Sequence, residues 1–304
     1  MLVFENEPLE YLINTNKHCI HKDYIEYLTG KNITKVKETN KKNYKIGIII
    51  PNYNYSEWID KCLNSILNQT YKNYEVIFID DMSTDNSVEI AKTYIDRMNI
   101  KIIELKQKRL SGGARNEGYL YLSKDVDYVW YVDSDDWLID DNVLQKINDN
   151  LAGEPDVLFV GLCTSQKKHL TTYFIPSYKD RYSAITGWSG SSGKVIKKEL
   201  ALRQECLYKE GTLKEDRTQH YKICIYMNSF KCLQETVYVW NKNNEKSVTT
   251  IRNDNWKVDT IRNYADALEL YNKEKGKDNK IDQLLMQRVN ECENELKTEG
   301  DSQR

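Results

Sequence analysis

Short apolar runs alternate along the chain with longer segments in which apolar residues recur every three or four positions. The runs have the length and composition of strands that are buried on both faces of a sheet. They are Ile46–Ile50, Glu75–Ile79, Ile100–Leu105 and Val129–Val132. The intervening segments predict amphipathic helices, the first capped by Ser56 and the next two at Ser87–Arg97 and Ala114–Leu122. Strands that alternate with helices predict an α/β fold with a mostly parallel sheet.

The pattern is less regular outside this region. Strands are expected at Asp156–Val160 and Leu170–Ile175, and an edge strand at Val237–Trp240. A loop rich in Gly and Ser covers Gly187–Gly193, ahead of a further helix. From Asn255 to Leu296 the spacing predicts long helices that pack on the rest of the chain or on a partner chain.

The composition is that of a soluble globular protein. The 304 residues are 40% hydrophobic and 30% charged, with a net charge of -2, so no broad basic excess invites nucleic acid. The chain has no apolar run long enough to cross a membrane and an acidic N-terminus unlike a signal peptide, so a cytoplasmic location is expected. Seven cysteines without a C-x-x-C pair are expected to be reduced and mostly buried.

Acidic residues follow one predicted strand directly. In the segment DYVWYVDSDDWL, Asp133, Asp135 and Asp136 come after the apolar run, with Ser134 among them. Ligands of open α/β sheets bind at the carboxyl ends of strands, and crowded carboxylates need a cation or a shared proton. Oxygen ligands suit Mg²⁺ or Mn²⁺, which also bind phosphate. The alternative is that Asp135 or Asp136 caps a helix that begins near Asp140.

A second acidic group ends another predicted strand. Asp85 is placed to cap the helix from Ser87. Asp81 has no such simple structural role, and its carboxylate could accept the N–H of a nucleobase while Tyr53 lies against the ring.

The segment KRLSGGARNEG follows the third predicted strand. Its two adjacent glycines are expected just before a helix, where they would allow the backbone to approach a ligand closely. Arg109 or Arg115 could neutralise a phosphate. The spacing matches neither a dinucleotide fingerprint nor a phosphate loop.

Four motifs in this order, IIIPNYN, IDDMSTDNS, GGARNEG and YVDSDDW, resemble the nucleotide-sugar half of a family 2 glycosyltransferase with the GT-A fold. The resemblance covers roughly residues 45–140. It implies that the nucleotide sugar is bound by Pro51, Tyr53, Asp81, Arg109, Arg115, Asn116, Asp133 and Ser134. It also implies that Asp133 and Asp135 hold the metal. Many relatives have Asn and Gly where this chain has Lys108 and Leu110, so Arg109 is the weakest correspondence.

The resemblance extends to the acceptor side. Glu215-Asp216 matches an acidic pair that family members carry on a helix facing the donor, and it implies that Asp216 is the general base. The alternative is an exposed acidic pair at a helix N-terminus. Trp188 and Lys194 resemble a segment that walls the acceptor pocket, and Lys246–Thr249 resembles a tail that closes over phosphate. His220 lies one helical turn beyond Asp216, where it could reach the site or be structural.

These observations predict an inverting, metal-dependent glycosyltransferase. It would use Mn²⁺ or Mg²⁺ and move a sugar from a nucleotide donor, expected to be UDP-linked, to a hydroxyl of a glycan or cell-surface polysaccharide. The expected parts are a helical appendage (1–44), a nucleotide-sugar half (45–160), an acceptor half (161–250) and a helical segment (251–304) through which the chain could self-associate. Two alternatives are the same chemistry on a hydroxylated DNA base and a nucleotide-sugar-binding module without catalysis. A phosphatase-like D-x-D nucleophile leaves IIIPNYN and GGARNEG unexplained.

Overall fold

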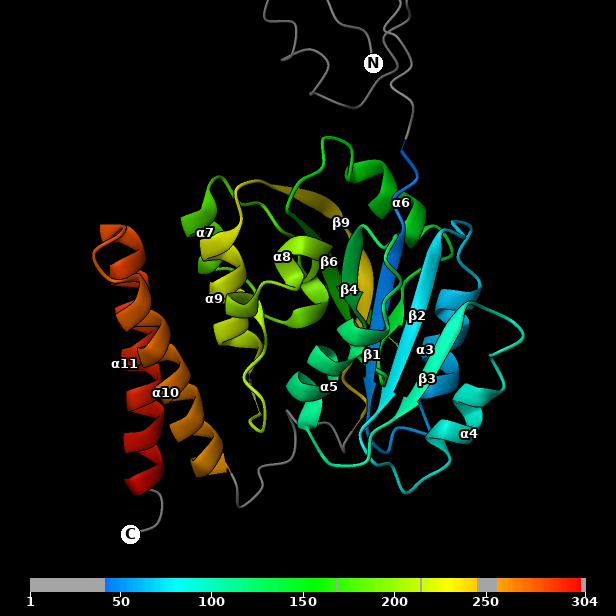
Figure 1. Cartoon of the computed structure of the whole chain (residues 1–304), viewed down its shortest axis with the longest axis horizontal. Helices are drawn as coiled ribbons and strands as arrows, with labels where there is room; N and C mark the ends of the chain where they lie inside the picture. Colours follow the sequence, from blue (N-terminus) through cyan, green and yellow to red (C-terminus); the bar gives the residue numbers. More distant parts are fainter. Residues whose placement is uncertain (1–41, 168, 214, 245–255, 302–304) are drawn as a thin grey trace, which may run out of the picture. The chain divides into compact units, whose positions relative to one another are not determined.

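Nine strands form one mixed sheet in the computed structural model, which describes residues 42–167, 169–213, 215–244 and 256–301 (Figure 1). The strand order is β3-β2-β1-β4-β8-β6-β9-β5, and β7 pairs with β6. Strands β1 to β4 are parallel, whereas β8 is antiparallel to both β4 and β6. The strands are β1 Ile46–Asn52, β2 Tyr74–Asp80, β3 Ile100–Glu104, β4 Tyr128–Tyr131, β5 Trp137–Leu138, β6 Val157–Gln166, β7 His169–Phe174, β8 Lys194–Lys197 and β9 Phe230–Asn241. This is the mostly parallel α/β sheet that the pattern predicts.

Helices cover both faces of the sheet. They are α3 Ile59–Leu67, α4 Ser87–Lys92, α5 Leu110–Gly118, α6 Val143–Asn150, α7 Arg181–Ile185, α8 Lys198–Ala201, α9 Asp216–Tyr226, α10 Trp256–Glu274 and α11 Asn279–Asp301. Because side chains alternate along a strand, Ile46, Ile48 and Ile50 of β1 enter one core and Ile49 enters the other. The first core includes residues of α3, α4 and α6, and the second includes residues of α5, α7, α8 and α9.

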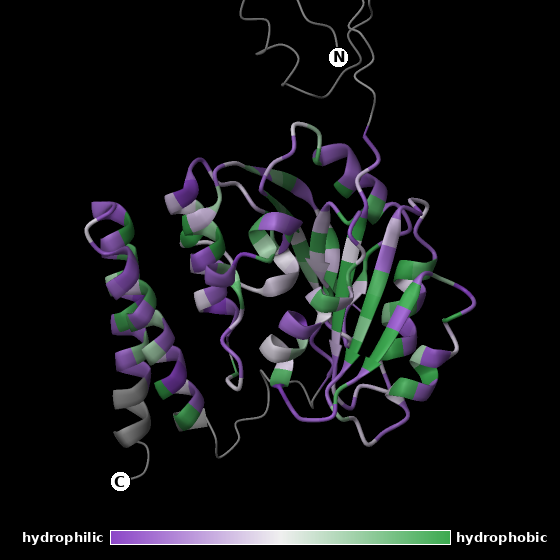
Figure 2. Ribbon diagram, in the orientation of Figure 1, coloured by the Kyte–Doolittle hydropathy of each residue, from purple (hydrophilic) through white to green (hydrophobic). Residues whose placement is uncertain are grey.

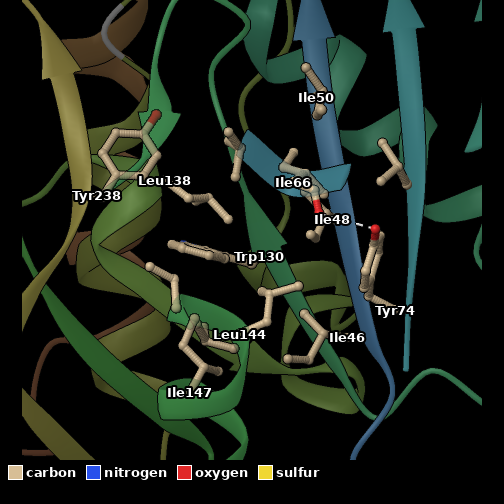
Figure 3. Close-up of a cluster of buried hydrophobic side chains, with 14 of the residues drawn as sticks. Ile46, Ile48, Ile50, Ile66, Tyr74, Trp130, Leu138, Leu144, Ile147 and Tyr238 are labelled. Carbon is tan, nitrogen blue, oxygen red and sulfur yellow. Dashed lines mark hydrogen bonds between the residues drawn. The ribbon is translucent and has the colours of Figure 1, made fainter. Parts of the chain in front are cut away.

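The first core is centred on aromatic and aliphatic side chains of the sheet. Figure 3 shows Trp130 of β4 between Leu138 and the α6 side chains Leu144 and Ile147, with Ile46 and Ile48 of β1 to one side. Figure 2 shows strands β1 and β2 coloured largely as hydrophobic, while α10 and α11 carry many hydrophilic residues. The strands that are buried on both faces are therefore those that the continuous apolar runs predict.

Two predictions about the starts of helices α3 and α5 are wrong. Ser56 does not cap the first helix, because α3 begins at Ile59 and the backbone N–H of Ser56 instead donates to Asp85 at 2.8 Å. The helix predicted to begin at Ala114 begins at Leu110, so the glycine pair lies within it. A Cβ on Gly112 would lie 2.7 Å from Cγ of Glu215. The close approach that Gly112 permits is therefore to an acidic side chain of the protein.

The predicted edge strand at Val237–Trp240 is also wrong. Strand β9 is longer and lies between β6, to which it is parallel, and β5, to which it is antiparallel. Val237 and Tyr238 belong to the first core, and this burial holds β9 inside the sheet. In β7, by contrast, five of the six residues are exposed.

The C-terminal helices pack on the same chain, one of the two arrangements expected for them. Helices α10 and α11 lie side by side (Figure 1). Nζ of Lys222 in α9 lies 3.0 Å from Asp266 of α10, and Arg217 lies 2.9 Å from Glu291 of α11. No helix among the described residues is both long and apolar enough to span a membrane.

Some sequence predictions concern residues that are not described. The expected helices within 1–41 and the segment Lys246–Thr249 lie outside the described residues. The described cysteines are free thiols, as predicted, and all but Cys232 are buried.

Candidate functional site

A cleft of about 370 Å³ opens where the carboxyl ends of β1, β2 and β4 face the start of α9. Parallel strands bring their carboxyl ends to one edge, which places motifs that are far apart in sequence around one space. Most of the predicted site residues line this cleft: Pro51, Tyr53, Asp81, Arg115, Asp133, Ser134, Asp135 and Asp216. Arg109 and Asn116 do not line it.

Asp81 is held by the backbone of the segment that leads into α5. Its carboxylate accepts the N–H of Arg109 at 2.7 Å and of Leu110 at 2.9 Å. Leu110 has φ of 59°, in the left-handed region, and its N–H donates to Asp81. Burial raises the pKa of Asp81 despite these donors. A carboxylate has about four lone-pair sites, so Asp81 can still accept a hydrogen bond from a ligand.

Tyr53 offers an aromatic surface at the same end of the cleft. Its side chain is 43% exposed, and Nζ of Lys108 lies 2.5 Å from the ring centroid. The neighbouring Asp80 has a different role, because its carboxylate accepts from Asn52 at 2.8 Å and from the Ser83 hydroxyl at 2.6 Å. Asp80 fastens the ends of β1 and β2 together, and Asp81 faces the cleft.

The acids after β4 have distinct surroundings. Asp136 accepts the Tyr238 hydroxyl at 2.6 Å and the Asn241 N–H at 2.8 Å, and burial raises its pKa well above the usual value. Asp135 accepts the side-chain amide of Asn244 at 2.7 Å. Burial and then the charge of Asp133 raise the pKa of Asp135 to about 6.

Neither Asp135 nor Asp136 caps a helix. Helix α6 begins at Val143 after Asn142, so the capping alternative is wrong. The buried hydroxyl of Ser134 has no hydrogen-bond partner among the described residues, and it lines the cleft between the acids. A buried polar group without a partner is costly, which makes Ser134 a suitable contact for a polar ligand.

Arg115 connects the two sides of the cleft. Its guanidinium is 2.7 Å from Asp133 and 2.7 Å from Glu215. Burial alone would lower the pKa of Arg115, but the adjacent carboxylates raise it, so the side chain is a permanent buried cation. Glu215 also accepts the hydroxyl of Ser111 at 2.7 Å. Gly112 in the same helix leaves the space that Glu215 needs.

Asp216 is the first residue of α9 and lines the cleft beside Glu215. Burial raises the pKa of Asp216, and the positive charges of Arg115 and Lys194 lower it in part. Glu215 is only 3% exposed. The alternative of an exposed acidic pair is therefore wrong.

Arg109 and Asn116 hold the segment before α9. Arg109 forms ion pairs with Glu117 and, at 2.8 Å, with Glu210. The amide of Asn116 exchanges two hydrogen bonds of 3.0 Å with the backbone of Tyr208. In this structure both residues bind protein groups and place the acidic pair against the cleft.

Lys194 and His220 lie outside the lining of the cleft. Nζ of the buried Lys194 donates to the carbonyls of Ser189 at 2.9 Å and Gly190 at 2.7 Å, which fixes the Gly/Ser loop. A ring nitrogen of His220 lies 2.9 Å from the carbonyl of Ala184, and burial lowers the pKa of His220 to about 3. His220 therefore has a structural role and does not reach the site.

Several residues of the site have no motif of their own. Trp240 of β9 lines the cleft, and Tyr238 and Asn244 bind the acids after β4. The apolar run Val237–Trp240 marks Tyr238 and Trp240 as strand residues, but their contacts depend on the pairing of β9 with β5 and β6. The sequence carries no other indication of them.

Comparison with known proteins identifies the family. The family described as Glycosyl transferase family 2 matches residues 47–230, more than half of the chain. The chain belongs to this family. Two relatives from Streptococcus pneumoniae are the glycosyltransferase GlyA, 43% identical over 100 residues, and the glycosyltransferase GlyG, 25% identical over 240 residues. The GlyA match covers 33% of this chain and 14% of GlyA, and the GlyG match covers 72% of this chain and 78% of GlyG.

Solved structures share the fold. TarS 1-349 from Staphylococcus aureus, in complex with UDP-GlcNAc, superposes with a TM-score of 0.69 at 20% identity over 81% of this chain and 72% of that chain. The mannosyltransferase PcManGT from Pyrobaculum calidifontis, in complex with GDP-Man and Mn²⁺, gives 0.54 at 17% identity over 80% and 68% of the two chains. The sheet and its helices therefore form a GT-A fold.

The donor set of the cleft fits a divalent metal that also binds phosphate. The described residues contain no cluster of three or more His, Cys, Asp or Glu side chains that would hold a metal by themselves. Asp133 and Asp135 nevertheless place carboxylate oxygens in one cleft, and burial followed by the charge of Asp133 raises the pKa of Asp135 to about 6. Oxygen ligands of this kind suit Mg²⁺ or Mn²⁺ when a diphosphate completes the coordination.

Proposed function

We propose that this protein is an inverting glycosyltransferase that moves a sugar from a nucleotide donor, a UDP-sugar, to a hydroxyl of a glycan or cell-surface polysaccharide. The observation that carries the proposal is one cleft in which Asp133 and Asp135 face Asp216. The names of GlyA and GlyG support glycosyl transfer, and the UDP-GlcNAc bound to TarS supports a UDP-linked donor.

The end of the cleft formed by β1 and β2 would bind the nucleoside. Tyr53 presents an exposed ring on which a base can stack, and Asp81 retains acceptor capacity for the base N–H. Pro51, near the carboxyl end of β1, lines the cleft beside them. Ser134 supplies a free hydroxyl toward ribose or phosphate.

Asp133 and Asp135 would hold Mn²⁺ or Mg²⁺ together with the diphosphate. The bound metal supplies Lewis-acid stabilisation of the negative charge on the departing diphosphate. Arg115 holds Asp133 in place at 2.7 Å and adds a positive charge behind it. Binding of the cation would also relieve the repulsion between Asp133 and Asp135, which supports their assignment as a pair.

Asp216 is the proposed general base. The acceptor hydroxyl oxygen attacks the anomeric carbon, the bond from that carbon to the phosphate oxygen breaks, and the hydroxyl proton passes to the carboxylate of Asp216. The raised pKa of Asp216 favours proton acceptance. Glu215 is less suitable, since its carboxylate already accepts from Arg115 and Ser111.

A release assay tests the proposal. The protein is incubated with Mn²⁺ and a panel of UDP- and GDP-sugars, with and without glycan acceptors, and the free nucleoside diphosphate is measured. We expect release from at least one donor, and acceleration by an acceptor. Binding without release would instead indicate a nucleotide-sugar-binding module.

Ligand linkage provides a second measurement. UDP and Mn²⁺ together should raise the melting temperature by more than the sum of their separate shifts, because each completes the binding of the other. The control replaces free Mn²⁺ with Mn²⁺ and excess chelator. Equal shifts in both samples contradict the metal assignment.

A further inference from the structure

An aromatic group leads out of the cleft along β9 and β7. Trp240 lines the cleft, and its ring centroid is 5.4 Å from that of Tyr173, at an interplanar angle of 80°. Trp188 lies behind them, 6.5 Å from Trp240 and 6.2 Å from Phe174. We use the name aromatic shelf for Tyr173 and Trp240.

The shelf is anchored on one side and open on the other. Trp188 and Phe174 pack against the first core, which fixes the rings beneath the shelf. Tyr173 is 53% exposed although it is a large aromatic residue. Packing against the described residues therefore does not explain why an aromatic side chain lies at position 173. An exposed aromatic ring next to a ligand cleft is a candidate contact for the ligand.

The surroundings of the shelf combine polar donors with apolar surface. Trp240, Thr164 and Thr171 are register partners across β9, β6 and β7, and Thr171 and Thr172 are exposed. Nζ of Lys242 lies 3.0 Å from the ring centroid of Trp240. A pyranose ring matches this combination, because its C–H face can lie on an aromatic ring while its hydroxyls reach threonine and lysine side chains.

We propose that the aromatic shelf is a subsite for the acceptor glycan, which binds a sugar unit next to the one that carries the reacting hydroxyl. This inference rests on the proposed function and names a part of its acceptor site. Trp240 supports it, since the same residue borders both the shelf and the cleft that contains Asp216. A sugar unit bound on the shelf would increase the affinity for the acceptor equally in the ground state and in the transition state.

Direct binding tests the shelf. The probes are cellotetraose, N-acetylchitotetraose and maltotetraose, each titrated by isothermal calorimetry into protein saturated with UDP and Mn²⁺. At least one should bind the wild type, and Tyr173→Ala should weaken that binding about tenfold, the size of one aromatic contact. Tyr173→Phe keeps the ring and should bind as the wild type does. The matched control is Leu170→Ala, which removes a side chain that is 54% exposed on the same strand.

Enzyme assays distinguish a failure of the shelf proposal from a failure of the proposed function. Release of nucleoside diphosphate from the donor in the absence of acceptor depends on the cleft and should be equal in the wild type and Tyr173→Ala. Where an acceptor is turned over, its KM should rise about tenfold in Tyr173→Ala with kcat little changed. If the wild type releases no diphosphate, the proposed function fails, and the titrations still decide whether the shelf binds glycan.

Two results overturn the inference. One is that no tetrasaccharide binds, or that Tyr173→Ala binds as tightly as the wild type. The other is that Tyr173→Ala converts a dimer to a monomer in sedimentation velocity without a change in glycan affinity. In that case a second copy of the chain covers β7.

Discussion

The acids after β4 and the acids at the start of α9 share one arrangement. In each group one carboxylate is fixed by protein donors: Asp136 by Tyr238 and Asn241, and Glu215 by Arg115 and Ser111. In each group a neighbour, Asp135 or Asp216, faces the cleft with a pKa raised by burial. The fixed acid determines the local geometry, and the neighbour is the residue for which a chemical role is proposed.

The two groups differ in what compensates their charge. Arg115 and Lys194 lower the pKa of Asp216 in part, so the cleft already contains positive charge near the proposed base. Asp135 has the amide of Asn244, a neutral donor, and a negative neighbour in Asp133. The difference favours an external cation for Asp135, whereas the acids at the start of α9 already have Arg115 and Lys194 near them. Each prediction below tests part of this comparison.

The largest effect is expected from Asp135→Ala. The change removes a proposed metal ligand, so transfer should fall by about a thousandfold or more and the affinity for UDP with Mn²⁺ should fall with it. Calorimetric titration and the release assay measure the two losses. Asp141→Ala, which removes an exposed acid nearby in the sequence, is the control and should leave both unchanged. Full activity in Asp135→Ala would falsify the metal assignment.

Asp216→Asn should have the next largest effect. The amide keeps the shape of the side chain but cannot take the proton, so transfer should fall by about a hundredfold or more. Titration with UDP and Mn²⁺ should give the wild-type affinity, because the donor side is intact. The matched variant is Glu215→Gln. If Glu215→Gln stops transfer and Asp216→Asn does not, the base is Glu215.

Arg115→Met tests the link between the two groups. The variant leaves Glu215 buried and Asp133 without its cation, so the free energy of unfolding should fall by about 3 kcal/mol. Urea denaturation at neutral pH measures the loss. Arg97→Met removes an exposed arginine and should cost less than about 1 kcal/mol. A small loss in Arg115→Met would show that the two groups are independent.

The smallest effect concerns the pH dependence of stability. The folded pKa of Asp135 is about 6, above its ordinary value of 3.8, so the folded state binds this proton more tightly than the unfolded state does. The stabilisation is complete below the ordinary pKa and is lost as the pH rises through 6. Without ligand and with chelator, Asp135→Asn should therefore be more stable than the wild type at pH 7 by up to about 2 kcal/mol.

Thermal unfolding between pH 4.5 and 8 checks this expectation. The melting temperatures of Asp135→Asn and the wild type should converge toward the acid end. Asp141→Asn is the control and should follow the wild type throughout. Saturating UDP and Mn²⁺ should reverse the order at pH 7, because only the carboxylate binds the cation. A constant difference across the pH range contradicts the pKa assignment.

Much of the donor side follows from the sequence alone. Continuous apolar runs mark β1, β2 and β4, and the polar residues that follow each run must meet at one edge of a parallel sheet. Asp81, Asp133 and Asp135 could be located in this way because the cause is local: the residues directly follow the strands that carry them. Helix starts were less predictable, since α5 begins earlier than its apolar pattern indicates.

Only the tertiary structure decided which acid of the cleft is fixed by Tyr238 and Asn241 and which is not. Asp135 and Asp136 are adjacent and chemically identical, and they differ because Tyr238 and Asn241, more than a hundred positions away, bind Asp136. The place of Trp240 depends likewise on the insertion of β9 between β5 and β6, which no periodicity in Val237–Trp240 specifies. Local pattern determines the type of an element and the order of its residues. Pairing between distant segments determines which side chains share a space, and that pairing is set by the burial of the whole sheet.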